Sequence, residues 1–308
     1  MLSFHPLLQE LNEPIAAARG VRLLLWRDDL AHPDLPGNKA RKLKYNLAAA
    51  RQQGHRALLT FGGAYSNHIA AVAAAGRLFG FQTIGLIRGD EPAPATALNP
   101  TLARAAADGM ALSYLDRPAY RQRAEPEFIA RQLVRFGPAY VLPEGGTNKL
   151  ALPGCAELVG EIRQLVAFDA LAVAAGTGGT LAGLLTGLAG PEQAVGVAVL
   201  KNGGFLRGEI DALTQSATGQ TSANYSVQTG YHFGGYAKYS DDLMGFIRQF
   251  RERHGVLLDP IYTGKLLYGV LDLIAQGHFA PGSTVVAIHT GGQQAWAGWE
   301  ARFGSGLG

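Results

Sequence analysis

The chain has 308 residues, of which 47% are hydrophobic and 17% charged, a balance typical of a globular protein with one large domain or two unequal ones. The net charge of +3 is too small an excess to indicate nucleic acid binding, although small anionic ligands remain compatible with it. The single cysteine, Cys155, excludes an internal disulfide and a cysteine-rich zinc site. Because the chain shows neither a secretion signal nor a run of about 20 apolar residues, we expect a cytoplasmic protein without a membrane or nucleic acid partner.

Short apolar runs alternate along the chain with segments of helical periodicity. The runs predicted to be strands are 21–26, 56–61, 82–87, 139–143, 169–176, 194–200 and 284–290. The segments predicted to be helices are 38–53, 67–79, 97–108, 150–166, 180–189, 240–254, 263–276 and 292–302. Strands that are apolar throughout are typical of a sheet covered on both faces. Their alternation with helices indicates parallel βαβ units and an α/β fold.

Ligands of parallel α/β sheets bind where the strands end, and this rule selects three glycine-rich loops. The first follows the strand 169–176 and opens the helix 180–189. Its residues are Gly176, Thr177, Gly178, Gly179 and Thr180. A glycine turn at a helix N-terminus presents free N–H groups and the positive end of the dipole, so a phosphate would fit there. It is not a Walker loop, because no lysine follows the glycines, and a tightly packed connector is the simpler alternative.

The second loop follows the strand 56–61 and contains Tyr65, Ser66, Asn67 and His68. Ser66 or Asn67 is expected to cap the next helix, and capping alone would explain one of them. A Ser-Asn pair at a helix start can also bind a carboxylate and a ring oxygen. His68 falls within the first helical turn, where a structural role is favoured.

The third loop, HTGG, follows the strand 284–290, and the Thr290 hydroxyl there could hydrogen-bond a heterocyclic nitrogen. No acidic partner for His289 can be identified, so a Ser–His–Asp triad has no support, and the GxSxG elbow is absent. The histidines are scattered without metal-ligand spacing, so we expect no metal site.

Three of the seven lysines, Lys39, Lys42 and Lys44, fall within the stretch LPGNKARKLKYN at 35–46. Lys39 lies in the first turn of a predicted helix, where the dipole disfavours a protonated amine and so favours a nucleophilic one. Such an amine can form a Schiff base with a carbonyl cofactor. Lys42 lies one turn later on the same face, placed to hold a cofactor phosphate, whereas Lys44 is rotated away. A solvated basic helix face is the alternative.

Six motifs occur in a characteristic order. They are GNKARKL (37–43), YSNH (65–68), PEGGTN (143–148), GTGGT (176–180), LDPIYTGK (258–265) and HTGG (289–292). Together they resemble the 1-aminocyclopropane-1-carboxylate deaminase and D-cysteine desulfhydrase family, whose members are pyridoxal 5'-phosphate (PLP) enzymes of the tryptophan synthase β fold type. The resemblance covers residues 35–293, and it is the collinear order that makes it specific.

This resemblance implies a two-domain fold type II PLP enzyme, an α/β protein with parallel sheets flanked by helices and the cofactor in the interdomain cleft. Residues 1–36 and 148–308 would form a large PLP-binding domain, and 37–147 a small mobile domain. Family members are commonly dimers, so a homodimer is expected by analogy.

The resemblance also implies roles in cofactor binding. Lys39 would hold PLP as a Schiff base and later shuttle protons, and the loop 176–180 would hold the phosphate with help from Lys42. Asn67 would hydrogen-bond the ring hydroxyl, and Thr290 would face the ring nitrogen.

Substrate contacts are expected from Tyr65, Ser66, Asn67 and His68 and from the DPIYTGK motif. Ser66 would contact the substrate carboxylate, and Tyr262 would lie over the substrate. A second active-site tyrosine is expected from the segment 231–239. Tyr236 is the candidate, although Tyr231 and Tyr239 compete with it.

Two positions separate the branches of the family. Ring-opening members carry Glu after the motif tyrosine and Leu in place of the HTGG threonine, whereas this chain has Thr263 and Thr290. A hydroxyl gives a weaker electron sink than a carboxylate, which suits loss of a good leaving group such as thiolate. The expected reaction is therefore α,β-elimination from D-cysteine or a similar amino acid. The alternatives are cyclopropane ring opening, another amino acid substrate, suggested by Tyr65 where desulfhydrases carry Gln, and ligand binding without turnover.

Overall fold

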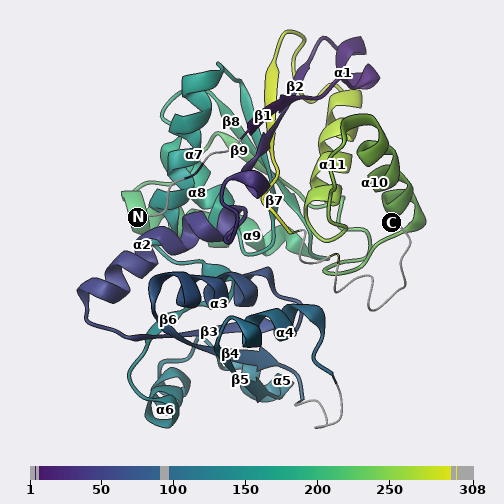
Figure 1. The fold of residues 1–308 in the computed structure, drawn as a ribbon. Coiled ribbons are helices and arrows are strands. Elements are labelled where there is room, and N and C mark those ends of the chain that lie inside the picture. Colours follow the sequence, from purple (N-terminus) through teal and green to yellow (C-terminus); the bar gives the residue numbers. More distant parts are fainter. Residues whose placement is uncertain (1–3, 5–6, 91–96, 293–295, 297–308) are drawn as a thin grey trace. The chain divides into compact units, whose positions relative to one another are not determined.

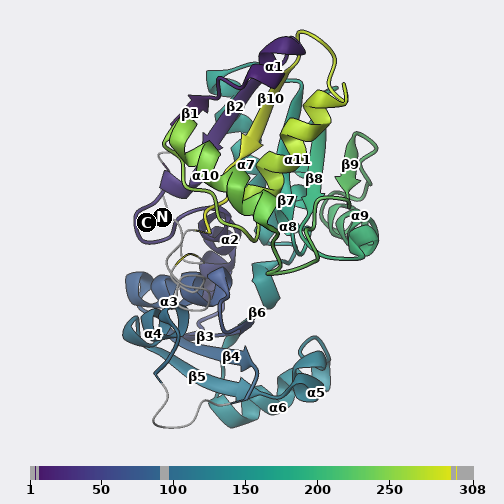
Figure 2. The ribbon, with the colours of Figure 1, turned by 90° about the vertical axis from the view of Figure 1, so that its right-hand side faces the viewer.

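The computed structural model describes residues 4, 7–90, 97–292 and 296. These divide into two compact units, each built on its own sheet with helices on both faces (Figures 1 and 2). The larger unit contains the described residues up to Lys42 and from Asn148 to Gly292, and the smaller unit contains those of Leu43–Thr147 together with Trp296. The predicted α/β class, with parallel sheets flanked by helices, is confirmed.

The larger unit has a six-stranded sheet in the order β1-β2-β10-β7-β8-β9. Its strands are β1 (Leu7–Glu10), β2 (Arg22–Arg27), β7 (Ala170–Ala175), β8 (Gln193–Ala198), β9 (Tyr225–Gln228) and β10 (Thr284–Ile288). Only β1 runs antiparallel to its neighbour. Val286 of β10 pairs with Leu24 on one side and Leu171 on the other, and all three side chains belong to the buried core.

Helices cover both faces of this sheet, with α7, α8 and α9 on one side and α10 and α11 on the other (Figure 1). The helices are α1 (Pro14–Ala18), α7 (Ala151–Leu165), α8 (Gly179–Gly187), α9 (Leu206–Thr218), α10 (Asp241–His254) and α11 (Thr263–Ala275), and 3-10 turns occupy Asp28–Leu30 and Gly203–Phe205. Cys155 lies fully buried in α7, and burial raises the pKa of its thiol to about 11. The thiolate is therefore scarce at neutral pH, so this cysteine is a packing residue.

The smaller unit has a four-stranded parallel sheet in the order β5-β4-β3-β6. Its strands are β3 (Ala57–Gly63), β4 (Gln82–Arg88), β5 (Met110–Leu115) and β6 (Tyr140–Leu142), with a 3-10 turn at Glu144–Gly146. The helices α3 (Asn67–Phe79) and α4 (Pro100–Ala107) lie on one face, and α5 (Arg117–Arg121) and α6 (Pro126–Phe136) on the other (Figures 1 and 2). Helix α2 (Asn38–Gln52) begins in the larger unit and ends in the smaller one.

The seven predicted strands are all present. Three further strands were not predicted from the sequence, and all three are edge strands: β1, β5 and β9. Their side chains are mostly half-buried or exposed, so they lack the continuous apolar run that marks a strand covered on both faces. Helices α1, α5, α6 and α9 were also missed. The predicted helix 292–302 lies, apart from residues 292 and 296, outside the described residues.

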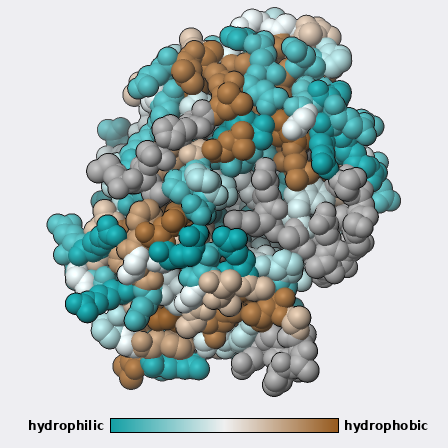
Figure 3. All heavy atoms as spheres, viewed as in Figure 1, coloured by the Kyte–Doolittle hydropathy of each residue, from teal (hydrophilic) through white to brown (hydrophobic). Residues whose placement is uncertain are grey.

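On the face shown in Figure 3, hydrophilic side chains separate smaller hydrophobic patches. Within the described ranges, the structure contains no helix with the length and apolar character needed to span a bilayer.

Candidate active site

The first turn of α2 packs against the two glycine-rich loops of the larger unit. The backbone N–H of Asn38 donates to the carbonyl oxygen of Thr290 at 3.3 Å, and the Asn38 side-chain amide donates to Thr180 Oγ1 at 2.8 Å. Gly37 has φ +76°, and a Cβ there would clash with the Thr290 carbonyl, so only glycine fits. Lys39 therefore directly follows a residue that is bonded to both loops.

The loop 176–180 opens α8 without a side-chain cap. Gly178 occupies the N-cap position in the left-handed region, with φ 73°. The first N–H groups of a helix have no carbonyl partner inside the helix, and they coincide with the positive end of its dipole. This turn is thus suited to an anion, and phosphate binding there stays a prediction.

Tyr262 packs on the first residue of this loop, and Tyr236 contacts Tyr262. A Cβ on Gly176 would lie 3.2 Å from Cε1 of Tyr262, so the tyrosine ring covers that glycine. The Tyr262 hydroxyl donates to the Tyr236 hydroxyl at 3.2 Å, with the rings edge to face. Tyr231 instead donates to Asp272 at 2.7 Å. Among the competing tyrosines, the contact with Tyr262 supports Tyr236.

Lys265 holds the segment that carries Tyr236, a function that sequence analysis missed. Its side chain is fully buried, and Nζ donates to the carbonyl oxygens of His232 and Gly235, each at 2.8 Å, and more weakly to Val199. Burial lowers the pKa of Lys265 to about 8. The one indication in the sequence that Lys265 has a role was its position as the last residue of the LDPIYTGK motif.

Thr263 is fully buried at the start of α11. Its hydroxyl donates to Asp259 Oδ2 at 2.6 Å and accepts from the Asp259 N–H at 2.8 Å, while Asp259 Oδ1 accepts from the N–H of Tyr262 at 2.7 Å. These bonds fix the turn that presents Tyr262. Substrate binding by Thr263 stays a prediction.

Lys42 and Arg41 are both buried, so the predicted basic helix begins with an interior face rather than a solvated one. Burial lowers the pKa of Lys42, which lies near Cys155. Arg41 forms ion pairs with Asp28 at 2.7 Å and Glu161 at 2.8 Å, a network that ties α2 to the larger unit. The ion pairs of Arg41 were not predicted from the sequence, and a phosphate contact by Lys42 stays a prediction.

His289 does have an acidic neighbour, and the prediction that it lacks one was wrong. Its Nδ1 lies 3.4 Å from Asp29 Oδ1, with both side chains fully buried. The Gly291 N–H donates to the same Nδ1, so Nε2 is the atom that donates to the Leu257 carbonyl oxygen at 3.0 Å. Asp29 is also bonded twice by Arg27. The contact between His289 and Asp29 is therefore a buried structural one, and it joins two strand ends that are far apart in the sequence.

In the smaller unit, Ser66 caps α3, as predicted for Ser66 or Asn67. Its hydroxyl accepts from the N–H groups of His68 and Ile69. Asn67 Oδ1 is buried and has no hydrogen-bond partner among the residues described. Tyr65 is 36% exposed.

His68 has a clear structural contact. Its Nε2 lies 2.8 Å from Thr60 Oγ1, which donates its single proton to the Leu142 carbonyl oxygen at 3.0 Å. Nε2 must therefore be the donor to Thr60. This agrees with the favoured structural role, and substrate binding by His68 remains a prediction.

Comparison with known proteins gives the family. The family described as "Pyridoxal-phosphate dependent enzyme" matches residues 7–291. The chain belongs to this family of PLP-dependent enzymes. It is 34% identical over 283 residues to a putative 1-aminocyclopropane-1-carboxylate deaminase of Pyrococcus horikoshii, covering 89% of this chain and 85% of the relative. It is 31% identical over 295 residues to the D-cysteine desulfhydrase of Salmonella typhi, covering 90% and 88%.

Solved structures agree with this family assignment. A crystal structure of a 1-aminocyclopropane-1-carboxylate (ACC) deaminase homologue has a TM-score of 0.83 and 32% identity, covering 94% of this chain and 90% of that one. A fungal L-serine ammonia-lyase from Rhizomucor miehei, 16% identical with a TM-score of 0.65, shares the fold. The resemblance inferred from the six motifs is confirmed.

The residues of the larger unit fit the cofactor of this family. PLP carries an anionic phosphate and an aldehyde. The uncapped start of α8 matches the phosphate, and the amine of Lys39 extends from a turn hydrogen-bonded to that same loop. In the smaller unit, the buried Asn67 Oδ1, for which the described residues offer no hydrogen-bond partner, is an acceptor suited to a hydroxyl group.

Proposed function

We propose that the protein is a PLP-dependent lyase that catalyses α,β-elimination from a small amino acid, with D-cysteine as the foremost candidate. D-Cysteine and water would give pyruvate, ammonia and sulfide. The observation that carries the proposal is the 2.8 Å hydrogen bond from Asn38 to Thr180, because it joins the turn of Lys39 to the anion-binding turn.

We assign cofactor binding to the residues that the resemblance predicts for it. Residues 176–180 would bind the phosphate with their N–H and hydroxyl groups, with Lys42 supplying charge. Lys39 would hold the aldehyde carbon, Asn67 would bond the ring hydroxyl, and Thr290 would face the ring nitrogen. When bound, PLP supplies the electron sink for cleavage at the α-carbon.

Binding or proton-transfer roles toward the substrate are assigned to four side chains, and three others line its site. The Lys39 amine, once released, would accept the α-proton, and Ser66 would bind the substrate carboxylate. The hydrogen-bonded hydroxyls of Tyr262 and Tyr236 would move or hold a proton near the leaving group. Tyr65, His68 and Thr263 would shape the space around the substrate.

Cyclopropane ring opening is a second candidate, because the Pyrococcus horikoshii relative bears that name. Thr263 and Thr290 stand against it, since ring opening lacks a good leaving group and demands a stronger electron sink. Another amino acid is the third candidate, supported by Tyr65 beside Ser66.

The test is to incubate the purified holoenzyme with D-cysteine and assay sulfide and pyruvate. We expect both products in equal amounts. A lack of product from D-cysteine, with 2-oxobutyrate formed from 1-aminocyclopropane-1-carboxylate, would establish the second candidate instead.

A matched pair of lysine variants tests the cofactor assignment. Lys39→Ala is expected to lose both the visible absorbance of bound PLP and turnover, whereas Lys44→Ala, two residues past the buried Lys42, is expected to keep both. A Lys39→Ala protein that still carries covalently bound PLP would contradict the proposal.

We also propose, by analogy with the family, a cytoplasmic homodimer with a cofactor-holding domain of residues 1–36 and 148–308 and a mobile domain of residues 37–147. Light scattering coupled to gel filtration tests the oligomeric state.

A further inference from the structure

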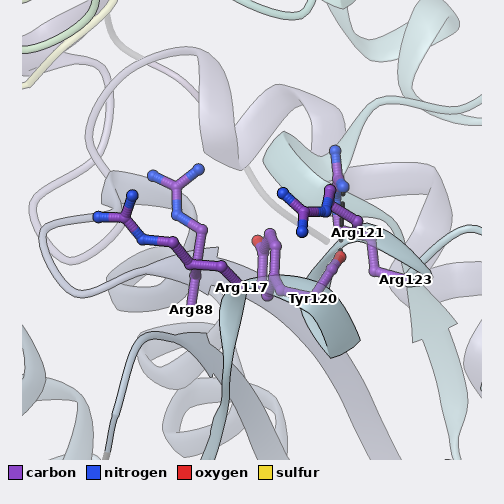
Figure 4. Close-up of a pocket in the computed structure, with 5 residues that line it drawn as sticks. All are labelled: Arg88, Arg117, Tyr120, Arg121 and Arg123. Carbon is purple, nitrogen blue, oxygen red and sulfur yellow. Dashed lines mark hydrogen bonds between the residues drawn. The ribbon is translucent and has the colours of Figure 1, made fainter.

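The smaller unit contains an arginine-lined cavity of about 350 Å³ at the carboxyl ends of β4 and β5 (Figure 4). Its lining residues are Arg88, Arg117, Tyr120, Arg121 and Arg123. Arg88 ends β4, and the other four belong to α5 or follow it closely. Figure 4 shows Tyr120 between the Arg88–Arg117 pair and the Arg121–Arg123 pair. Segments from two strand ends thus bring four guanidinium groups around one space.

The positive charge of this cavity is only partly neutralised. Arg123 forms an ion pair with Glu144 at 2.7 Å. In the part of the chain that the structure describes, none of the ion pairs involves Arg88, Arg117 or Arg121. Guanidinium groups remain charged at every physiological pH, so three charges without an ion-pair partner among the described residues face the cavity. Their mutual repulsion would be relieved by a bound anion.

Tyr120 lies buried among these arginines. Its side chain is 2% exposed, with the Cζ atoms of Arg88 and Arg123 lying 5.6 Å and 5.1 Å from the ring centre. The buried hydroxyl makes no hydrogen bond of normal geometry within the described ranges, but the Glu144 carboxylate lies near it. Burial, and after it the charge of Glu144, raise the pKa of Tyr120, so the hydroxyl stays protonated and can donate.

We infer that this cavity binds a small oligoanion, a compact ligand with two or more negative charges on phosphate or carboxylate groups. Guanidinium groups bind both through paired N–H donors. Tyr120 is the only aromatic residue among the described residues of the lining, and its burial leaves no face on which a nucleotide base could stack. The ligand is therefore charged throughout rather than built on an apolar body.

Arg88 also lies close to the second predicted loop, which restricts the choice of variants. A Cβ on Gly63 would lie 3.5 Å from Arg88 Nη2, and the Gly63 carbonyl accepts from the Ser66 N–H. Changing Arg88 would disturb the turn of Ser66. Arg117 and Arg121 are exposed, and the described part of the chain shows no such contact for them, so they are the better positions.

The test is calorimetric titration of the PLP-saturated holoenzyme, in which the cofactor occupies its own phosphate site. Pyrophosphate is the phosphate probe, citrate is the carboxylate probe, and acetate is the monovalent control. The variant is Arg117→Gln with Arg121→Gln. The control is Arg56→Gln with Arg135→Gln, which removes two exposed charges from the same unit at positions outside the cavity.

We expect pyrophosphate to bind one site in the wild type and in the control, and to bind at least about tenfold more weakly in the cavity variant. If citrate also binds the wild type and binds the cavity variant more weakly to the same degree, the ligand class includes carboxylates. If citrate does not bind, the class is restricted to phosphates. The inference is overturned if pyrophosphate gives no binding at millimolar concentration, if both variants bind equally, or if acetate binds as tightly as pyrophosphate.

Discussion

The side-chain amide of Asn38 donates a hydrogen bond to the hydroxyl of Thr180 at 2.8 Å, across 142 positions of sequence. One end of this bond is the residue before Lys39, and the other is in the uncapped first turn of α8. The bond therefore sets the distance between the lysine turn and the anion-binding turn. A cofactor held by both turns would depend on that distance.

Replacing Asn38 by alanine should weaken PLP binding. A typical hydrogen bond contributes about 1 kcal/mol, which corresponds to an affinity loss of about fivefold. The measurement is a PLP titration of the apoenzyme, followed by absorbance. Asn99→Ala is the matched control, because Asn99 caps α4 in the smaller unit and its loss should lower stability without changing PLP affinity. Equal effects of the two variants would refute the role of Asn38.

Gly37 and Gly54 form a second matched pair. Both have φ near +77°, so alanine at either position incurs about 1–2 kcal/mol of left-handed strain. A Cβ on Gly54 meets open space, whereas one on Gly37 meets the Thr290 backbone. We expect Gly37→Ala to lower the free energy of unfolding by at least about 3 kcal/mol, and Gly54→Ala by no more than the strain. Chemical denaturation measures both, and similar losses would contradict the close packing of Gly37 on Thr290.

Much of the fold could be predicted because central parallel strands are apolar throughout. VRLLLW and TVVAIHT belong to β2 and β10, which lie side by side in the sheet. The edge strands β1, β5 and β9 could not be recognised in this way, since one side of an edge strand pairs with nothing and its side chains need not be apolar. Their place in the sheet is decided by tertiary packing rather than by local pattern.

The loops of the candidate site could be located from sequence, but the partners of buried charges could not. Arg41 belongs to a lysine-rich segment whose composition is typical of a solvent-exposed helix face. Its burial depends on ion pairs with Asp28 and Glu161, and no local sequence pattern indicates that these residues are its partners. His289 and Asp29 are a similar case. Spacing also could not choose among three tyrosines in an irregular segment, whereas the contact with Tyr262 favours Tyr236.

Tyr236 and Tyr231 can be separated by kinetics. Tyr236→Phe removes the hydroxyl that accepts from Tyr262, and we expect kcat of the proposed elimination to fall about 10- to 100-fold with the fold intact. Tyr231→Phe removes a hydrogen bond to Asp272 and should cost about 1 kcal/mol of stability while leaving kcat unchanged. Steady-state kinetics and thermal unfolding of both variants check this. A fall in kcat for Tyr231→Phe alone would move the assignment to Tyr231.

Because Lys265 has a lowered pKa, the free energy of unfolding is expected to change with pH in a defined direction. Burial lowers its pKa in the folded state from 10.5 to about 8, so between these values the unfolded chain binds more protons than the folded one. Stability from this group is therefore lowest below pH 8 and rises as the pH increases towards 10.5. The structure gives the reason. A neutral amine has two hydrogens for the two carbonyls at 2.8 Å and avoids the cost of a buried charge.

The measurement is the free energy of unfolding by denaturant at a series of pH values across this window. Lys265→Met should flatten the rise, because methionine keeps the apolar length of the side chain but does not titrate. Lys149→Met, at an exposed position, should leave the rise as it is in the wild type. Amide exchange of residues 231–239, corrected for intrinsic rates, should slow over the same range in the wild type only. An unchanged slope in Lys265→Met would assign the titration to another group.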